Sequence, residues 1–289
     1  MRSITNMLKT AIIIPAHNEE RYIKSCLENY ISQTVRPDLV LVVDDNSQDN
    51  TFQIVTAISD LHPWIKSARH SSEAIHRPGA KVVNAFNYGM SLLGDEFELI
   101  GKFDADILLP ENYFERVFQA FRQDPELGLC SGLLYIKRAD EWVYESIANH
   151  THVRGPLKLY RTKCIRAMGG LRPGLGWDTA DTFLIELHGY KMKTLPELKV
   201  KHLRPTGASY QSSMAVKQGM GYRNMRYGLM IAFLASLKVA WTKRSITVIW
   251  QSLRGYFRAA NDKLPYLVTK EEGRFIRKRR WQLIGQKLF

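Results

Sequence analysis

The stretch AIIIPAHNEE, residues 11–20, sets the fold class. Its first five residues form a short apolar run rich in β-branched side chains, which predicts a buried strand. Polar residues follow at once, and from residue 19 to residue 33 apolar residues recur at the spacing of an amphipathic helix. This opening therefore predicts a strand that leads directly into a helix.

The same strand-and-helix unit recurs as far as residue 136. Apolar runs at 39–43, 65–68, 97–103 and 129–136 predict further strands, and the segments that follow Asn50, Gly79 and Pro110 predict helices between them. Repeated β-α units with apolar strands are typical of a mostly parallel sheet that is covered by helices on both faces. We therefore expect an α/β fold.

The charge of the chain is concentrated in its last part. The net charge is +13, and residues 211–289 hold 16 Lys and Arg against 3 Asp and Glu. The first 210 residues hold 25 residues of each sign and are neutral overall. We therefore expect a domain at 1–210 and a basic helical extension at 211–289, with a division of the first domain near residue 108.

Several classes of protein are excluded by composition. The three cysteines have no CxxC spacing, which argues against a disulfide scaffold or a cysteine-based zinc site and fits a reducing compartment. No apolar run is long enough for a secretory leader or a membrane-spanning helix. Because the basic extension carries no recognised nucleic-acid-binding motif, we expect no nucleic-acid partner.

Acidic residues gather where the predicted strands end. Glu19 follows the first strand, Asp44 and Asp45 end the second, and the triplet Asp104-Ala105-Asp106 ends the fourth. In open α/β sheets, ligands bind beyond the carboxyl ends of the strands. Carboxylates that face one another there need a cation or a donor-rich ligand, and their oxygens suit Mg²⁺ or Mn²⁺ bound to substrate phosphates.

Taken together, these segments resemble the inverting family 2 glycosyltransferases of GT-A fold, whose catalytic domain is Rossmann-like. The resemblance is carried by residues 13–20, 43–51, 79–87 and 104–106, and by Gly169-Gly170-Leu171 leading to Gly176-Trp177-Asp178 and His188-Gly189-Tyr190. It covers roughly residues 10–206. It implies transfer of a sugar from a nucleoside-diphosphate sugar, with UDP favoured, to an acceptor hydroxyl.

The resemblance also implies a set of donor-binding residues. Asp45 would accept a hydrogen bond from the base, Asp104 would face the ribose, and Asp106 would bind the metal, Mn²⁺ or Mg²⁺. His202 is at the place of a further metal ligand in some GT-A enzymes. The expected nucleotide-binding residues are Pro15, Ala16, Glu19, Asp45, Lys81 and Asp104. Glu19 as a first-turn helix carboxylate and Lys81 as a solvated lysine remain open alternatives.

A carboxylate must also take the proton of the acceptor hydroxyl. The distance in sequence from Asp178 to Gly189 fits the position of the family's catalytic base, and Asp181 is the competing carboxylate. Asp178 as only a helix N-cap is the structural alternative. Trp177 replaces the family's usual Glu, so we weigh it both as an acceptor platform and as a core side chain. A catalytically idle sugar-nucleotide-binding subunit therefore remains an alternative function.

The basic extension contains amphipathic segments rich in Trp, Phe and Arg. Such segments are typical of helices that lie on an anionic membrane surface, although a helical cap on the catalytic domain is also compatible with them. With membrane contact, the expected acceptor is a lipid-linked saccharide in cell-envelope polysaccharide synthesis, or else a bare polyprenyl phosphate. The expected location is cytoplasmic, peripheral at the inner face of the cell membrane.

Overall fold

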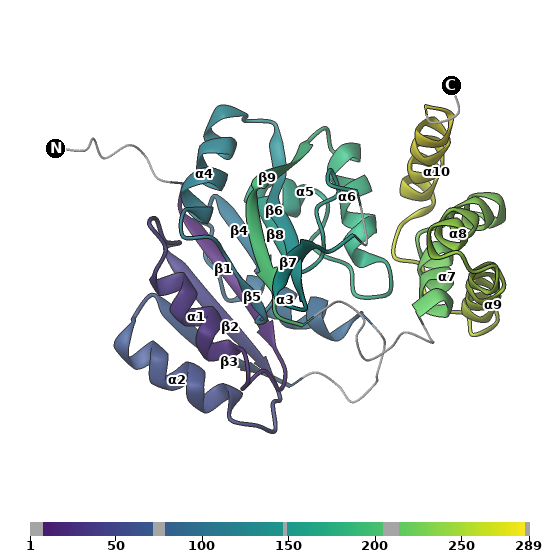
Figure 1. Ribbon diagram of the computed structural model, residues 1–289. Helices are drawn as coiled ribbons and strands as arrows, with labels where there is room; N and C mark the ends of the chain where they lie inside the picture. Colours follow the sequence, from purple (N-terminus) through teal and green to yellow (C-terminus); the bar gives the residue numbers. More distant parts are fainter. Residues whose placement is uncertain (1–7, 72–78, 147–148, 205–213, 287–289) are drawn as a thin grey trace. The chain divides into compact units, whose positions relative to one another are not determined.

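The structure is a computed structural model that describes residues 8–71, 79–146, 149–204 and 214–286 (Figure 1). The strands in these ranges are β1 (Thr10–Ala16), β2 (Leu39–Asp45), β3 (Ile65–His70), β4 (Leu99–Phe103), β5 (Ile107–Leu108), β6 (Leu127–Arg138), β7 (Glu141–Tyr144), β8 (Leu157–Arg161) and β9 (Lys191–His202). The helices are α1 (Ile23–Ile31), α2 (Thr51–Leu61), α3 (Lys81–Ser91), α4 (Tyr113–Gln123), α5 (Thr162–Ala167), α6 (Trp177–Leu187), α7 (Met214–Asn224), α8 (Leu229–Lys243), α9 (Thr247–Asn261) and α10 (Lys270–Gly285).

The chain divides into two compact units. The sheet unit comprises residues 1–76, 81–171 and 188–205, and the helical unit comprises residues 77–80, 172–187 and 206–289. The domain boundary expected near residue 210 lies among residues 205–213, outside the described residues. Helix α6, which carries Asp178, groups with the C-terminal helices rather than with the sheet.

The described strands of the sheet unit form one sheet. Its order is β3-β2-β1-β4-β8-β6-β9-β5, and β7 pairs with β6 at the side. Strands β3, β2, β1 and β4 are parallel, which confirms the predicted α/β fold, while β8 runs antiparallel to both β4 and β6. The carboxyl ends of β1, β2 and β4 therefore lie at one edge of the sheet.

Helices cover both faces of the parallel strands (Figure 1). Ile12 and Ile14 of β1 belong to the core cluster formed with α1 and α4. Ile13 points to the opposite face, where its side chain contacts α3 so closely that a Cβ on Gly89 would lie 2.7 Å from it. Successive residues of a strand face opposite sides of a sheet, so a strand buried on both faces must be apolar throughout.

The first helix begins later than its apolar spacing predicts. Residues 19–22 form a turn in which the carbonyl of Glu19 accepts hydrogen bonds from the backbone N–H groups of Tyr22 and Ile23, both at 2.9 Å. The N–H of Glu19 donates to Thr51 Oγ1 at 2.7 Å. Glu19 therefore belongs to the loop beyond β1 and is not part of α1.

In the helical unit, α7 and α9 cross with their backbones in contact. A Cβ on Gly219 of α7 would lie 1.7 Å from the carbonyl oxygen of Ser252, and a Cβ on Gly255 of α9 would lie 2.0 Å from that of Val216. Only glycine permits this approach. The two helices are thereby fixed as one layer.

This crossing gives a first prediction. Gly219→Ala is expected to lower the stability of the helical unit by about 1–3 kcal/mol, because the methyl group forces the helices apart. Gly285→Ala in α10 is the matched control, since nothing lies within 4 Å of the added Cβ, and it should be neutral or slightly stabilising. Thermal unfolding followed by circular dichroism compares the two. Equal melting temperatures for both variants would contradict the proposed close crossing.

Candidate functional site

The acidic residues expected at the sheet edge come from three neighbouring strands. Glu19 lies in the loop after β1, Asp45 is the last residue of β2, and Asp104 and Asp106 follow β4. Asp45, Asp106 and Glu19 are all at least nine-tenths buried. Pro15 and Ala16 form the end of β1, and Lys81 is the first residue of α3.

A short strand pairing brings His202 to Asp106. Strand β5 begins at the residue after Asp106, and it pairs antiparallel with the end of β9, where Ile107 lies opposite His202. The N–H of Leu203 donates to the carbonyl of Asp106 at 2.8 Å. As a result His202 Nε2 lies 3.6 Å from Asp106 Oδ1. The structure thus brings together the two residues expected to bind metal.

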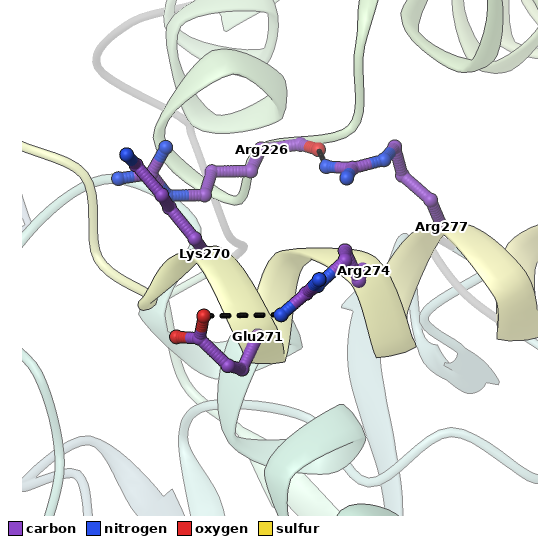
Figure 2. Close-up of a pocket in the computed structure, with 5 residues that line it drawn as sticks. All are labelled: Arg226, Lys270, Glu271, Arg274 and Arg277. Carbon is purple, nitrogen blue, oxygen red and sulfur yellow. Dashed lines mark hydrogen bonds and ion pairs between the residues drawn. The ribbon is translucent and has the colours of Figure 1, made fainter.

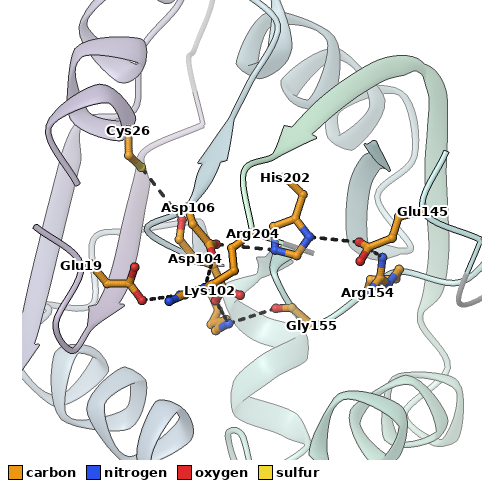
Figure 3. A network of polar contacts seen from close by, with 10 residues as sticks. All are labelled: Glu19, Cys26, Lys102, Asp104, Asp106, Glu145, Arg154, Gly155, His202 and Arg204. Carbon is orange, nitrogen blue, oxygen red and sulfur yellow. Dashed lines mark hydrogen bonds and ion pairs between the residues drawn. The ribbon is translucent and has the colours of Figure 1, made fainter. Parts of the chain in front are cut away.

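The carboxylates are paired with cations in a chain of polar contacts (Figure 3). Arg204 donates from Nε to Asp106 Oδ2 at 3.0 Å and from Nη2 to Glu19 Oε1. The other ring nitrogen of His202, Nδ1, lies 3.0 Å from Glu145 Oε2. That carboxylate oxygen also accepts a hydrogen bond from Arg154.

Asp104 has its own counter-charge in Lys102, which lies two residues earlier, in β4. Lys102 is 2% exposed and donates from Nζ to Asp104 Oδ1 and, at 3.1 Å, to the carbonyl of Gly155. Asp104 Oδ1 is therefore already engaged by a buried ammonium group. Side chains of the protein thus supply cations beside Asp104, Asp106 and Glu19.

The charges shift the pKa values of the central groups. Burial alone would raise the pKa of Asp106, but the hydrogen bonds and charges of His202 and Arg204 hold it below its usual value. Burial opposes protonation of His202, yet Asp106 and Glu145 raise its pKa to about 9. Glu19 differs, because its burial outweighs Arg204 and raises its pKa. At neutral pH the site therefore holds an ionised Asp106 between two cations.

Three buried carboxylate oxygens at this edge have no hydrogen-bond partner among the described residues. They are Asp106 Oδ1, Glu19 Oε2 and Asp44 Oδ1. A buried acceptor without a partner is costly, so it calls for an ordered water, an ion or a functional role as its explanation. Within the described ranges no three His, Cys, Asp or Glu residues are grouped to hold a metal by themselves.

A divalent cation nevertheless fits this donor set. Mg²⁺ is commonly held by one or two carboxylates together with substrate phosphates rather than by a complete protein cage, and Mn²⁺ also accepts imidazole. Asp106 Oδ1 would supply one oxygen, and His202 Nε2 would supply one nitrogen after the metal displaces its proton. The remaining ligands would have to come from a phosphate-bearing substrate and water.

The expected catalytic carboxylates lie in the helical unit. Asp178 is in the first turn of α6 and is partly exposed, whereas Asp181 is 3% exposed. Asp178 is the second residue of the helix and not the residue before it, so the N-cap alternative does not hold. Trp177 is 9% exposed, which fits a core side chain better than an open platform.

Sequence reasoning missed Arg204, Lys102, Glu145 and Arg154. Arg204 was detectable, because residues two apart on an extended segment share a face and His202 was already a candidate. Lys102 lies in an apolar strand, where a buried lysine is unusual and calls for a partner. Glu145 and Arg154 follow no pattern that would have placed them beside His202.

The chain was compared with known proteins. A family model described as glycosyl transferase family 2 matches residues 11–172. The enzyme dolichyl N-acetyl-alpha-D-glucosaminyl phosphate 3-beta-D-2,3-diacetamido-2,3-dideoxy-beta-D-glucuronosyltransferase of Methanococcus voltae is 26% identical over 130 residues, which is 43% of this chain and 38% of that protein. The match thus spans well under half of the relative's length.

Solved structures share the fold. The mannosyltransferase PcManGT of Pyrobaculum calidifontis, solved with GDP-Man and Mn²⁺, is 18% identical with a TM-score of 0.58, covering 96% of this chain and 80% of that one. Residues 1–349 of TarS from S. aureus, solved with UDP-GlcNAc, are 19% identical with a TM-score of 0.56, covering 80% of this chain and 66% of that one.

Proposed function

We propose, from the premise that this chain belongs to glycosyl transferase family 2, that it is a metal-dependent inverting enzyme that transfers a hexose from a UDP-sugar to an acceptor hydroxyl. The observation that carries the metal dependence is the buried Asp106 Oδ1, which lies 3.6 Å from His202 Nε2 and has no hydrogen-bond partner within 3.5 Å among the described residues. Two similar structures were solved with nucleotide sugars, one of them with Mn²⁺, which supports this choice of donor class and ion.

The donor would bind along the edge formed by β1, β2 and β4. Asp45, at the end of β2, would accept a hydrogen bond from the uracil N–H, and Asp104 would accept one from the ribose. Pro15 and Ala16 would line the nucleoside, with Lys81 near the base or phosphates. A metal held by Asp106 and His202 would supply positive charge to the leaving diphosphate.

Arg204 has a part in this scheme. Its guanidinium spans Glu19 and Asp106, so it holds the position that a cation bound to Asp106 would share. With a metal bound at Asp106, the guanidinium of Arg204 would be able to donate two parallel hydrogen bonds to a phosphate. Arg204 would then neutralise the diphosphate together with the ion.

Transfer with inversion requires a base on the acceptor side. Asp178 would accept the hydroxyl proton as the new bond forms, and its partial exposure in the first turn of α6 leaves its carboxylate accessible to an acceptor. Asp181 is buried and therefore the weaker candidate. The proposed acceptor is a lipid-linked saccharide used in cell-envelope polysaccharide synthesis, which puts the enzyme at the inner face of the membrane. The Methanococcus voltae relative, whose name includes a dolichyl phosphate, supports this acceptor class.

A panel of nucleotide sugars tests the donor. UDP-, GDP- and dTDP-sugars are added with and without Mn²⁺, and thermal unfolding is measured. A UDP-sugar with Mn²⁺ should stabilise the fold by about 2.7 kcal/mol at one hundred times its Kd, and a chelator should remove the effect. Stabilisation by a GDP- or dTDP-sugar alone would overturn the choice of base. No stabilisation by any of them would overturn the proposed function.

A further inference from the structure

The helical unit exposes large apolar side chains. Of the 13 large apolar residues exposed in the described parts of the chain, eight lie on α8, on α9 or in the loop between them. Trp241 is 86% exposed, Ile246 72% and Trp250 70%. The eight residues, which we call the apolar face, are Leu229, Met230, Phe233, Leu237, Trp241, Ile246, Trp250 and Phe257.

These residues follow helical spacing. Leu229, Phe233, Leu237 and Trp241 are four residues apart and form one stripe along α8. On α9 and the residue before it, Ile246, Trp250 and Phe257 share one side in the same way. The apolar face is therefore a stripe along α8 and a row along α9 in which Arg254 lies between Trp250 and Phe257.

The inner sides of the same helices carry smaller residues. The buried residues of α8 are Ile231, Ala232, Ser236 and Ala240, and those of α9 are Val248, Ser252, Gly255 and Ala259. In a helix that is folded only for a protein core, the largest apolar side chains are the ones removed from water. Here Phe233, Trp241, Trp250 and Phe257 are exposed instead, which is the pattern of a surface that binds a partner.

Charge indicates what that partner is. Residues 229–261 carry five basic residues and no acidic ones, and the basic residues are Lys238, Lys243, Arg244, Arg254 and Arg258. Apolar and aromatic side chains flanked by Lys and Arg are typical of helices that lie in the interface of an anionic membrane. In the described residues no helix is sufficiently long and apolar to span a bilayer.

The helical unit also contains a basic pocket (Figure 2). It has a volume of about 350 Å³ and is lined by Arg226, Lys270, Glu271, Arg274 and Arg277, which gives it a formal charge of +3. A Cβ on Gly228, the residue before α8, would lie 3.7 Å from Arg277 Cδ. Arg277, which lines the pocket, therefore lies close to the residue that precedes Leu229.

Two of the arginines that line the pocket are held in place by contacts with neighbouring residues. Arg226 donates from Nε to the carbonyl of Val268 at 2.8 Å, and its guanidinium lies 3.5 Å from the ring centroid of Tyr266. Arg277 donates to the carbonyl of Arg226 at 2.8 Å. Glu271 forms an ion pair with Arg274 at 3.1 Å and is the one acidic residue among the five that line the pocket. Fixed cations in excess of their acidic partners suit a phosphate group.

We propose that α8 and α9 form a docking surface for an anionic phospholipid membrane, with Trp241 and Trp250 at the boundary of headgroups and acyl chains and a lipid phosphate in the basic pocket. This inference rests on the proposed function, which includes a location at the membrane, and it names the surface that would bind there. It would bring the enzyme to an acceptor that never leaves the bilayer.

Vesicle co-sedimentation of the full chain tests the proposal. The protein should pellet with vesicles of phosphatidylcholine and phosphatidylglycerol, and high salt should weaken binding because it screens the basic residues. Trp241→Ser with Trp250→Ser should weaken binding by about tenfold or more. Leu61→Ser with Leu92→Ser, two exposed leucines of the sheet unit, is the matched control and should change nothing. Lys270→Gln with Arg274→Gln should remove the preference for phosphatidylglycerol.

Three outcomes would overturn the proposal: no binding by the unmodified chain, binding unchanged in the tryptophan variant, or a stable dimer that buries both tryptophans without lipid. Sedimentation velocity detects the dimer. The nucleotide-sugar panel is repeated on the tryptophan variant, which should respond as the unmodified chain does. A variant that loses vesicle binding but still binds the donor would identify the docking surface. A failure of the proposed function would instead appear as a loss of donor binding in the unmodified chain.

Discussion

Replacing Asp178 by asparagine is expected to lower the rate of sugar transfer by about 10²–10⁴-fold, while donor binding stays unchanged. The amide has the same shape as the carboxylate but does not accept a proton at neutral pH. Because the residue lies in the first turn of α6 and is partly exposed, the substitution leaves the core of the helical unit intact. Steady-state transfer at saturating donor and donor titration by thermal shift measure the two effects.

Asp181→Asn is the comparison for this prediction. Asp181 is three residues further along α6 and is 3% exposed, so its substitution should affect stability more than turnover. If Asp181→Asn abolishes transfer and Asp178→Asn does not, the base is Asp181. If both variants leave transfer unchanged, neither carboxylate is the base. If the unmodified chain binds donor and transfers nothing, it is the idle sugar-nucleotide-binding subunit that Trp177 suggested.

The parallel half of the sheet was predictable from sequence because its strands are buried on both faces. The apolar runs at 11–15 and 39–43 match β1 and β2 closely. Strand β8 was not predicted, since Leu157–Arg161 contains two basic residues in five and shows no continuous apolar run. Lys158 of this strand is fully buried, and no local sequence pattern predicts that burial. The antiparallel pairing of β8 with β4 and β6 was therefore not predictable from the sequence.

The candidate site was predictable only in part, because some of its contacts leave no pattern in the local sequence. The acidic residues after β2 and β4 follow from chain order, because parallel strands end at one edge. The approach of His202 to Asp106 depends on β5, which is two residues long and too short to leave a sequence signal. The pairing of Arg204 with Asp106 and Glu19 joins segments far apart in sequence, whereas Lys102 lies only two residues from Asp104. Sequence thus indicates the acids but not how they are neutralised.

Asp106→Asn is expected to abolish metal-dependent donor binding and to lower transfer by roughly 10²–10³-fold, because bound metal contributes several kcal/mol of charge stabilisation. The substitution removes the charge that faces His202 and Arg204 but keeps the side chain's size. The Mn²⁺-dependent part of the thermal shift with UDP-sugar should vanish. Asp95→Asn, an acid of the same unit whose side chain is 92% exposed, is the matched control and should behave as the unmodified chain.

Arg204→Gln tests whether the guanidinium of Arg204 and the metal ion compete for Asp106. Without donor, this variant should bind Mn²⁺ more tightly than the unmodified chain, because the competing guanidinium is gone from Asp106 and Glu19. With donor, it should bind the nucleotide sugar more weakly, since one group that contacts the diphosphate is lost. Calorimetric titration with Mn²⁺ alone and with UDP-sugar resolves both changes. If Asp106→Asn keeps its Mn²⁺ response while Arg204→Gln binds Mn²⁺ no better, the metal site is not at Asp106, and the cations found there are structural partners of the acid.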